Sequence, residues 1–219
     1  MPTICRVGSS IFTISSEYSL LSLCLWCVSL DSNFLTLPLT VTPYLFLLSI
    51  IYRDLKPDNI GFDVRGDVKI FDFGLAKEFD PTTVADDGTY KLTGDTGSPR
   101  YMATEVALNQ PYNELCDVFS FCILLWQLLK IETPFDGYTM SMFKKQVIAA
   151  GSRPKVDPKW PAELCDMMRR GWGPSLKDRP SMEDISLALR EEISKNTDEE
   201  VDEIMDASRK SELSLHRGF

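Results

Sequence analysis

The chain has 219 residues, 44% of them hydrophobic and 25% charged, which is ordinary for a globular protein of one domain with appendages. Its formal net charge of −9 argues against nucleic acid as a general partner, and its single histidine, His216, excludes a Ser-His-Asp triad and a histidine-rich metal site. The six cysteines suggest no disulfide framework. We interpret them as thiols of an intracellular protein and expect a cytoplasmic location.

Residues 1–49 differ in composition from the rest of the chain. Up to residue 51 there are only three charges, on Arg6, Glu17 and Asp31. The apolar run 20–30 is too short to cross a bilayer, and the run 34–51 contains two prolines, which break helices. We therefore predict a separate apolar segment over 1–49, with membrane association through residues 20–51 as the alternative.

Residues 51–74 carry the candidate chemistry. Apolar residues alternate over 60–64 and again over 68–71, around a glycine-containing turn, and this pattern predicts a β-hairpin. Such a hairpin would bring Asn59 beside Asp72, one neutral and one charged oxygen ligand of the kind that Mg²⁺ prefers. Asp54 would remain free to orient a substrate hydroxyl and accept its proton. Lys56 could place its positive charge against a transferring phosphoryl group.

The run YRDLKPDN, followed by DFG, resembles the catalytic loop and metal-binding hairpin of eukaryotic-type protein kinases. The resemblance covers residues 50–190 and implies an α+β, mostly helical C-terminal lobe, with a short hairpin carrying the metal site. It also implies that ATP and Mg²⁺ bind through Lys56, Asn59 and Asp72, and that protein hydroxyls are phosphorylated. Lys56 favours the serine/threonine type, whereas residues 117–129 look nearer to the tyrosine-kinase-like branch.

Residues 72–105 resemble an activation segment, and their polar part, 80–97, has the composition of a mobile loop. Arg53 resembles the family arginine that pairs with a phosphorylated residue of this segment. Thr93 and Thr96 are equal candidates for that modification.

The end of the segment reads GSPRYMATE. Ser98 matches the family position whose hydroxyl bridges the catalytic aspartate and lysine. The family's closing Ala-Pro-Glu is Ala-Thr-Glu here, ending at Glu105. Thr104 in place of proline removes a fixed φ angle, so we expect the loop's shape to be less well fixed.

Further helices are predicted over 112–130, 140–150, 162–171 and 182–193. The first is apolar on nearly all sides, as a buried helix would be. The resemblance places Asp117, near its start, where it braces the catalytic loop. It also makes Arg179 the buried partner of Glu105. The tail, 191–219, has nine acidic and four basic residues, and we predict that it is partly disordered.

The sequence contains no G-x-G-x-x-G and no lysine before Lys56, the elements with which a kinase N-terminal lobe holds ATP. We therefore expect a serine/threonine protein kinase domain that lacks its N-terminal lobe and whose own activity is weak or absent. The alternative is a non-catalytic, kinase-derived fragment that binds other proteins. The expected partners are ATP and a protein substrate, without nucleic acid.

Overall fold

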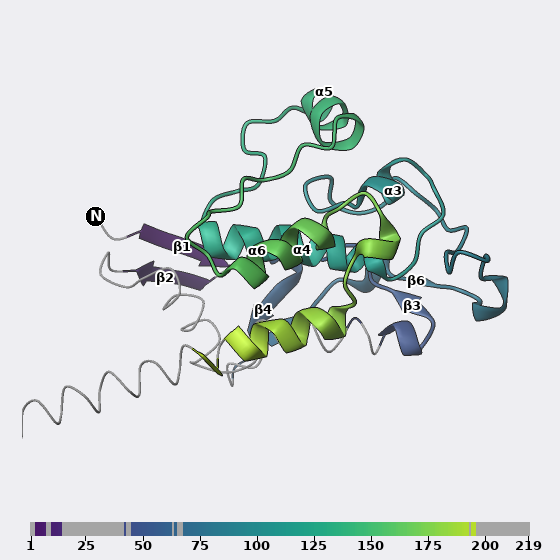
Figure 1. The fold of residues 1–219 in the computed structure, drawn as a ribbon, viewed down its shortest axis with the longest axis horizontal. Coiled ribbons are helices and arrows are strands. Elements are labelled where there is room, and N and C mark those ends of the chain that lie inside the picture. The colour runs from purple at the N-terminus through teal and green to yellow at the C-terminus, as the bar shows by residue number, and fades with distance from the viewer. Residues whose placement is uncertain are drawn as a thin grey trace, which may run out of the picture.

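The computed structural model describes residues 3–7, 10–14, 42, 45–62, 64, 68–192 and 194–195 (Figure 1). The described part is mostly helical, as the kinase resemblance implies. Its α-helices are α3 (Thr104–Ala107), α4 (Leu115–Lys130), α5 (Met140–Met142), α6 (Ala162–Gly171) and a further helix over 182–192. None of the described helices is long and apolar enough to cross a membrane.

Helix α4 forms the centre of the hydrophobic core, and twelve of its sixteen residues are buried. The prediction of a buried helix here is confirmed, although the helix begins at Leu115 rather than at residue 112. Tyr112 is extended because it forms a β-bridge with Tyr90. Helix α6 packs closely on α4 at Gly171, where an added Cβ would lie only 2.2 Å from the Cys122 sulfur (Figure 1).

Two short antiparallel pairs hold the segment that carries the candidate chemistry. Strand β3 (Ile50–Ile51) pairs with β6 (Lys77–Glu78), and β4 (Ile60–Phe62) pairs with β5 (Val68–Ile70). The second pair is the predicted hairpin, with Ile60 opposite Ile70. Its turn, at 63 and 65–67, lies outside the described residues. The loop 52–59 is thus anchored at both ends by strands.

The single helix predicted over 140–150 is not what the structure has. The chain forms α5 and then continues as a π-helix, η4 (Phe143–Ala149), in which each turn is wider. Both buried residues of η4, Phe143 and Val147, lie four positions apart, so the wider turns still keep them on one side. Figure 1 shows this segment at the top of the molecule, on two extended connections.

Most of the predicted N-terminal segment and of the acidic tail lies outside the described residues. Strands β1 (Thr3–Val7) and β2 (Ser10–Ile14) form an antiparallel hairpin that the sequence analysis did not predict. Residues 45–49 pack on the kinase-like body, since the Phe46 ring stacks on Phe79 at 5.2 Å. The boundaries at residues 49 and 191, and the membrane alternative, stay predictions.

Candidate active site

The loop 52–59 owes its shape to one buried carboxylate. The Asp117 oxygens accept hydrogen bonds from the backbone N–H groups of Tyr52, at 3.0 Å, and Arg53, at 2.8 Å. Arg53 adopts a left-handed conformation, with φ of 68°, that few non-glycine residues occupy. Burial raises the pKa of Asp117 to about 6, although these two hydrogen bonds act to lower it. The predicted position of Asp117 against the loop is therefore the one observed.

Asp54 stands at the centre of the candidate site and is only 4% exposed. One carboxylate oxygen accepts hydrogen bonds from Lys56 Nζ, at 2.6 Å, and Asn59 Nδ2, at 2.9 Å, while the other accepts one from the Ser98 N–H at 2.9 Å. Burial raises the pKa of Asp54, but these hydrogen bonds and the Lys56 charge outweigh it, so the pKa lies below its usual value. The carboxylate is therefore ionised at neutral pH.

The activation segment docks on this loop through Gly97 and Ser98. Lys56 Nζ donates to the Ser98 hydroxyl at 2.9 Å, so Lys56 connects Asp54 with Ser98. Gly97 has φ of +109°, and an added Cβ would lie 2.5 Å from the Arg53 carbonyl oxygen. Only glycine fits this approach. The role of Gly97 could not be predicted, because nothing local in the sequence reveals which backbone a glycine will face.

Asn59 and Asp72 are brought together by the hairpin. The Phe71 N–H donates to the backbone carbonyl of Asn59 at 2.8 Å. Asp72 is the next residue after Phe71, so it lies close to Asn59. Asn59 uses its amide nitrogen to donate to Asp54, which leaves its carboxamide oxygen as a possible ligand. Asp72 is exposed and uses one carboxylate oxygen to accept from the Gly74 N–H. One carboxamide and one carboxylate oxygen fit Mg²⁺, which takes few protein ligands when phosphates supply the rest.

Tyr52 stands where the family usually has histidine, and it links the loop to the residues before Gly74. The side chain is fully buried, and its hydroxyl donates to the Phe71 carbonyl oxygen. Its ring meets the Phe73 ring edge-on at 5.3 Å. Burial raises the pKa of Tyr52, so the phenol stays protonated and remains a donor. No local pattern in the sequence predicts this contact.

The structure distinguishes the two candidate threonines of the activation segment. Arg53 Nη1 donates to the Thr93 hydroxyl at 2.9 Å and to the Tyr112 hydroxyl at 3.0 Å. The Thr96 hydroxyl instead donates to the Gly94 carbonyl at 2.9 Å. Arg53 therefore contacts Thr93 directly.

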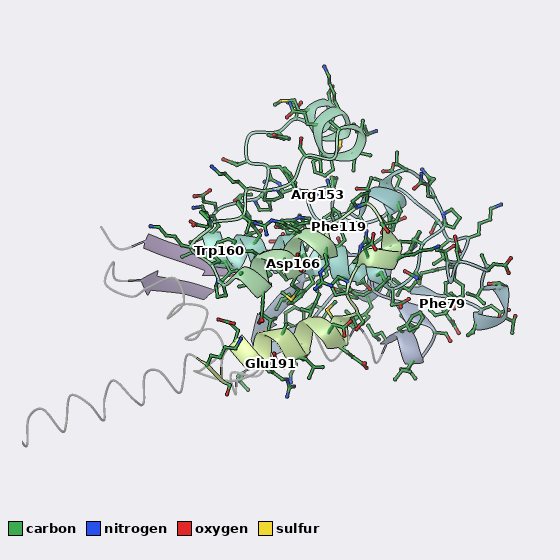
Figure 2. The ribbon with its side chains drawn as sticks, in the orientation of Figure 1. Phe79, Phe119, Arg153, Trp160, Asp166 and Glu191 are labelled. Atoms are coloured by element: carbon green, nitrogen blue, oxygen red, sulfur yellow. The ribbon has the colours of Figure 1, made fainter. Side chains whose placement is uncertain are left out.

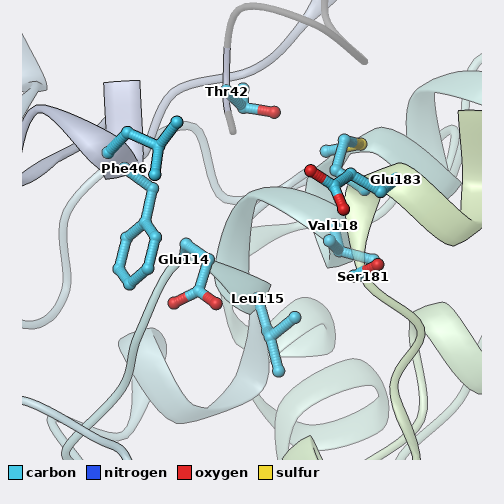
Figure 3. A pocket seen from close by; sticks show the side chains of 9 residues that line it. Thr42, Phe46, Glu114, Leu115, Val118, Ser181 and Glu183 are labelled. Carbon is cyan, nitrogen blue, oxygen red and sulfur yellow. The ribbon is translucent and has the colours of Figure 1, made fainter. Parts of the chain in front are cut away.

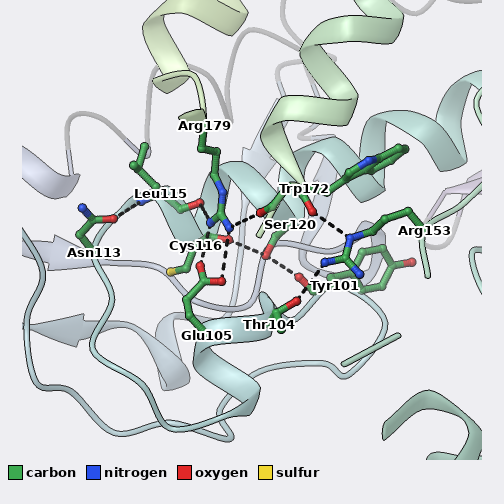
Figure 4. Close-up of polar contacts among 11 residues, drawn as sticks. Tyr101, Thr104, Glu105, Asn113, Leu115, Cys116, Ser120, Arg153, Trp172 and Arg179 are labelled. Carbon is green, nitrogen blue, oxygen red and sulfur yellow. Dashed lines mark hydrogen bonds and ion pairs between the residues drawn. The ribbon is translucent and has the colours of Figure 1, made fainter. Parts of the chain in front are cut away.

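The predicted ion pair between Glu105 and Arg179 is present and buried (Figure 4). Two parallel contacts join the groups, Nη1 to Oε1 at 2.7 Å and Nη2 to Oε2 at 3.3 Å. Arg179 also donates to the carbonyls of Leu115, at 2.7 Å, and Gly173, at 3.0 Å. This one side chain therefore ties the end of the activation segment to α4 and to the residues after α6.

Thr104 is held in place by an arginine that the sequence analysis did not single out. Arg153 Nη2 donates to the Thr104 hydroxyl at 3.0 Å, and its Nε donates to the Trp172 carbonyl at 2.8 Å (Figure 4). The guanidinium also lies over the Phe119 ring, 4.9 Å from its centroid (Figure 2). A proline side chain could not accept this hydrogen bond. Thr104 therefore replaces the lost φ restraint with a side-chain contact.

Two pockets on the described part of the surface lie near the segments discussed above. One, of about 320 Å³, opens beside Lys56 and Ser98. The other, of about 170 Å³, shares no lining residue with the first and is bordered by Phe46, Glu114 and Ser181 (Figure 3). Burial raises the pKa of Glu114 there. Only the first pocket includes residues that contact Asp54.

Comparison with known proteins agrees with this geometry. The protein kinase domain family matches residues 33–188. The chain is 39% identical to the dual specificity protein kinase shkB of Dictyostelium discoideum over 145 residues, which is 65% of the chain and 21% of that protein. It is 34% identical to the serine/threonine-protein kinase STY46 of Arabidopsis thaliana over 176 residues, 80% of the chain and 28% of that protein.

The mitogen-activated protein kinase kinase kinase 7 of Drosophila melanogaster is 36% identical over 143 residues, 65% of the chain and 20% of that protein. The chain thus spans less than a third of the length of each of these relatives. The family match covers well over half of the 219 residues and includes the loop, the hairpin, the activation segment and the helices from α3 to α6. The chain belongs to the protein kinase family.

Proposed function

We propose that the chain carries the phosphate-transfer site of a protein kinase that moves the γ-phosphate of ATP to serine or threonine hydroxyls of other proteins. The observation that carries the proposal is the network around Asp54. A buried, ionised carboxylate receives hydrogen bonds from Lys56 and Asn59 of its own loop and from the Ser98 backbone of the activation segment. The names of the curated relatives, which are serine/threonine and dual specificity kinases, support the same class.

In this mechanism Asp54 orients the acceptor hydroxyl and takes its proton as the oxygen attacks the γ-phosphorus. The bond between the γ-phosphorus and the oxygen that bridges it to the β-phosphate breaks, and ADP leaves. Lys56 donates a hydrogen bond to the transferring group, where positioning and charge do most of the catalytic work. Because the pKa of Asp54 is lowered, its carboxylate is a weak base. It therefore serves mainly to position the hydroxyl and accepts the proton late.

Asn59 and Asp72 would hold Mg²⁺, which neutralises charge on the phosphate oxygens when bound. The support is the donor set itself, one carboxamide oxygen and one carboxylate on neighbouring strand ends. The Gly74 N–H donates a hydrogen bond to the Asp72 carboxylate at 3.1 Å, which holds this side chain in place. Lys56, Asn59 and Asp72 together form the nucleotide side of the site.

Phosphorylation of Thr93 would strengthen the contact that Arg53 already makes with its hydroxyl. A phosphate there adds charge-assisted hydrogen bonds to the guanidinium and fixes the segment against the loop. Thr96 lacks such a cation among its hydrogen-bond partners in the described residues. We therefore favour Thr93 as the regulatory site.

Residues 1–49 do not supply the elements with which a kinase N-terminal lobe holds ATP. They contain no lysine and no G-x-G-x-x-G, so we propose that this segment does not form a kinase N-terminal lobe and that the 219 residues alone transfer phosphate weakly. A cytoplasmic location, and protein substrates rather than nucleic acid, complete the proposal.

The test joins residues 45–219 to the N-terminal lobe of a related serine/threonine kinase, so that the Phe46–Phe79 stack is kept. Transfer of labelled γ-phosphate to a serine peptide is then measured with Mg²⁺. We expect clear transfer by the joined protein and little by the 219-residue chain. A folded joined protein that binds Mg-ATP but labels no protein or peptide would contradict the proposed activity and favour a binding module.

A further inference from the structure

Tyr112, just before helix α4, is tied to the activation segment through both its backbone and its side chain. Its backbone N–H donates to the Tyr90 carbonyl at 3.1 Å, and its carbonyl accepts from the Tyr90 N–H at 2.9 Å. Its hydroxyl donates to the backbone carbonyl of Thr93 at 2.8 Å. The side chain is fully buried, so the hydroxyl depends on partners inside the protein. Tyr112 therefore holds the segment at Tyr90 and again at Thr93.

The same hydroxyl also accepts a hydrogen bond from Arg53. Arg53 Nη1 donates to it at 3.0 Å and to the Thr93 hydroxyl at 2.9 Å, while Nε donates to the Leu75 carbonyl at 2.7 Å. All of these acceptors are uncharged oxygens. Arg53 is thus oriented by two carbonyl or hydroxyl groups of the activation segment and by Tyr112, with the threonine hydroxyl itself as one partner.

Tyr112 and Asp117 hold different parts of Arg53. The Asp117 carboxylate accepts from the Arg53 backbone N–H at 2.8 Å, whereas Tyr112 binds the guanidinium. The Arg53 backbone has φ of 68°, a conformation that persists only where the surroundings enforce it. Asp54 is the next residue along the chain. Contacts that fix Arg53 from both sides therefore also fix the position of the Asp54 carboxylate.

We propose that the Tyr112 hydroxyl is a positioning group that keeps Arg53 and the activation segment in place while Thr93 is unphosphorylated, so that phosphate transfer does not require that modification. The hydroxyl suits this role because it donates to the Thr93 carbonyl and accepts from Arg53 at the same time. The inference rests on the proposed kinase function, because it concerns the regulation of that site. Phosphorylation of Thr93 would then strengthen a segment that is already docked.

The protonation state of Tyr112 agrees with this role. Burial raises the pKa of the phenol, although the hydrogen bond and the charge of Arg53 act to lower it. The hydroxyl therefore keeps its proton at neutral pH and can donate to the Thr93 carbonyl.

The first test measures amide hydrogen exchange in the 219-residue chain, which requires no catalysis. Tyr112→Phe keeps the buried ring and the backbone pairing with Tyr90 and removes only the hydroxyl. We expect exchange about tenfold faster at the Asp95 amide, which donates to the Val106 carbonyl at 2.8 Å, and unchanged exchange in α4. Unchanged exchange at Asp95, or an equal acceleration throughout α4, would overturn the proposal.

A pair of threonine variants tests whether Tyr112 acts through Arg53. Thr93→Glu places a carboxylate where the hydroxyl now accepts from Arg53, so a charge-assisted hydrogen bond can replace the one lost in Tyr112→Phe. Thr96→Glu is the matched control, because the Thr96 hydroxyl donates to the Gly94 carbonyl instead. We expect Thr93→Glu to restore slow exchange in the Tyr112→Phe chain and Thr96→Glu not to. Restoration by both variants or by neither would contradict the role of Arg53.

The second test uses the joined protein after treatment with a phosphatase. We expect the treated protein to transfer phosphate, Tyr112→Phe to lower kcat about tenfold with little change in the KM for ATP, and Thr93→Glu to restore kcat. Transfer that occurs only when Thr93 carries phosphate would overturn the inference and leave the proposed function intact. The expected exchange pattern without phosphate transfer in any form of the joined protein would contradict the proposed function alone.

Discussion

Removing Arg179 should be among the most damaging single changes to this fold. Its ion pair with Glu105 is buried at both ends, with 0% and 8% of the two side chains exposed and 2.7 Å between the closest atoms. Arg179→Ala leaves the Glu105 carboxylate buried without its partner and frees the carbonyls of Leu115 and Gly173. Breaking a buried pair from one side costs ~3–5 kcal/mol, and we expect the free energy of unfolding to fall by that amount.

Urea denaturation followed by tryptophan fluorescence measures this loss. The control is Arg170→Ala, which breaks an ion pair with Asp166 whose side chains are 52% and 61% exposed, and which should cost ~0.5 kcal/mol or less. Replacing both Glu105 and Arg179 by Met should recover part of the loss, because no buried charge is then left alone. If Arg179→Ala lowers the free energy of unfolding no more than the Arg170→Ala control does, the ion pair between Glu105 and Arg179 does not hold the end of the activation segment.

Three further changes test the surroundings of the site. Gly97→Ala should lower the free energy of unfolding by ~1–3 kcal/mol, measured by denaturation, since the new Cβ would meet the Arg53 carbonyl. The control, Gly137→Ala, is also at positive φ but has open space around it and should cost less. Equal losses in the two variants would contradict the close contact at Gly97. Thr104→Val should lower stability by ~1 kcal/mol by removing the acceptor of Arg153, whereas an unchanged melting temperature would show that this hydrogen bond contributes nothing. Burial raises the pKa of Asp117 to about 6, so between about pH 4 and 6 the folded state keeps a proton that the unfolded state has released. The free energy of unfolding therefore falls as pH rises through this range, by up to ~3 kcal/mol. Asp117→Asn should lack this pH dependence. If the pH curves of the two proteins run parallel, the raised pKa of Asp117 is refuted.

The parts of the site that could be predicted from sequence are those set by local patterns. Alternating apolar residues and a glycine turn predicted the hairpin that brings Asn59 towards Asp72, and the uninterrupted apolar run predicted the buried helix α4. The Glu105–Arg179 pair, 74 residues apart in sequence, was predictable only through the family resemblance. Charge alone would not have chosen that partner among the 23 basic residues of the chain.

The contacts that sequence reasoning missed depend on distant segments. Gly97 is required because of the Arg53 carbonyl, and Tyr52 matters because its hydroxyl reaches Phe71. Arg153 lies 49 residues from Thr104, and no motif links them. The π-helical turns of η4 were also not predicted, because the spacing of Phe143 and Val147 suits an ordinary helix equally well.

The central claim is that Asp54 acts on the acceptor hydroxyl. It is tested most directly by phosphate transfer to a serine peptide in the joined protein, with and without Asp54→Asn. The substitution keeps the size of the side chain but removes the charge that orients the hydroxyl and accepts its proton. We expect kcat to fall by ~10²–10⁴ while the KM for ATP changes little. Turnover by the Asp54→Asn protein at the rate of the unaltered one would contradict it.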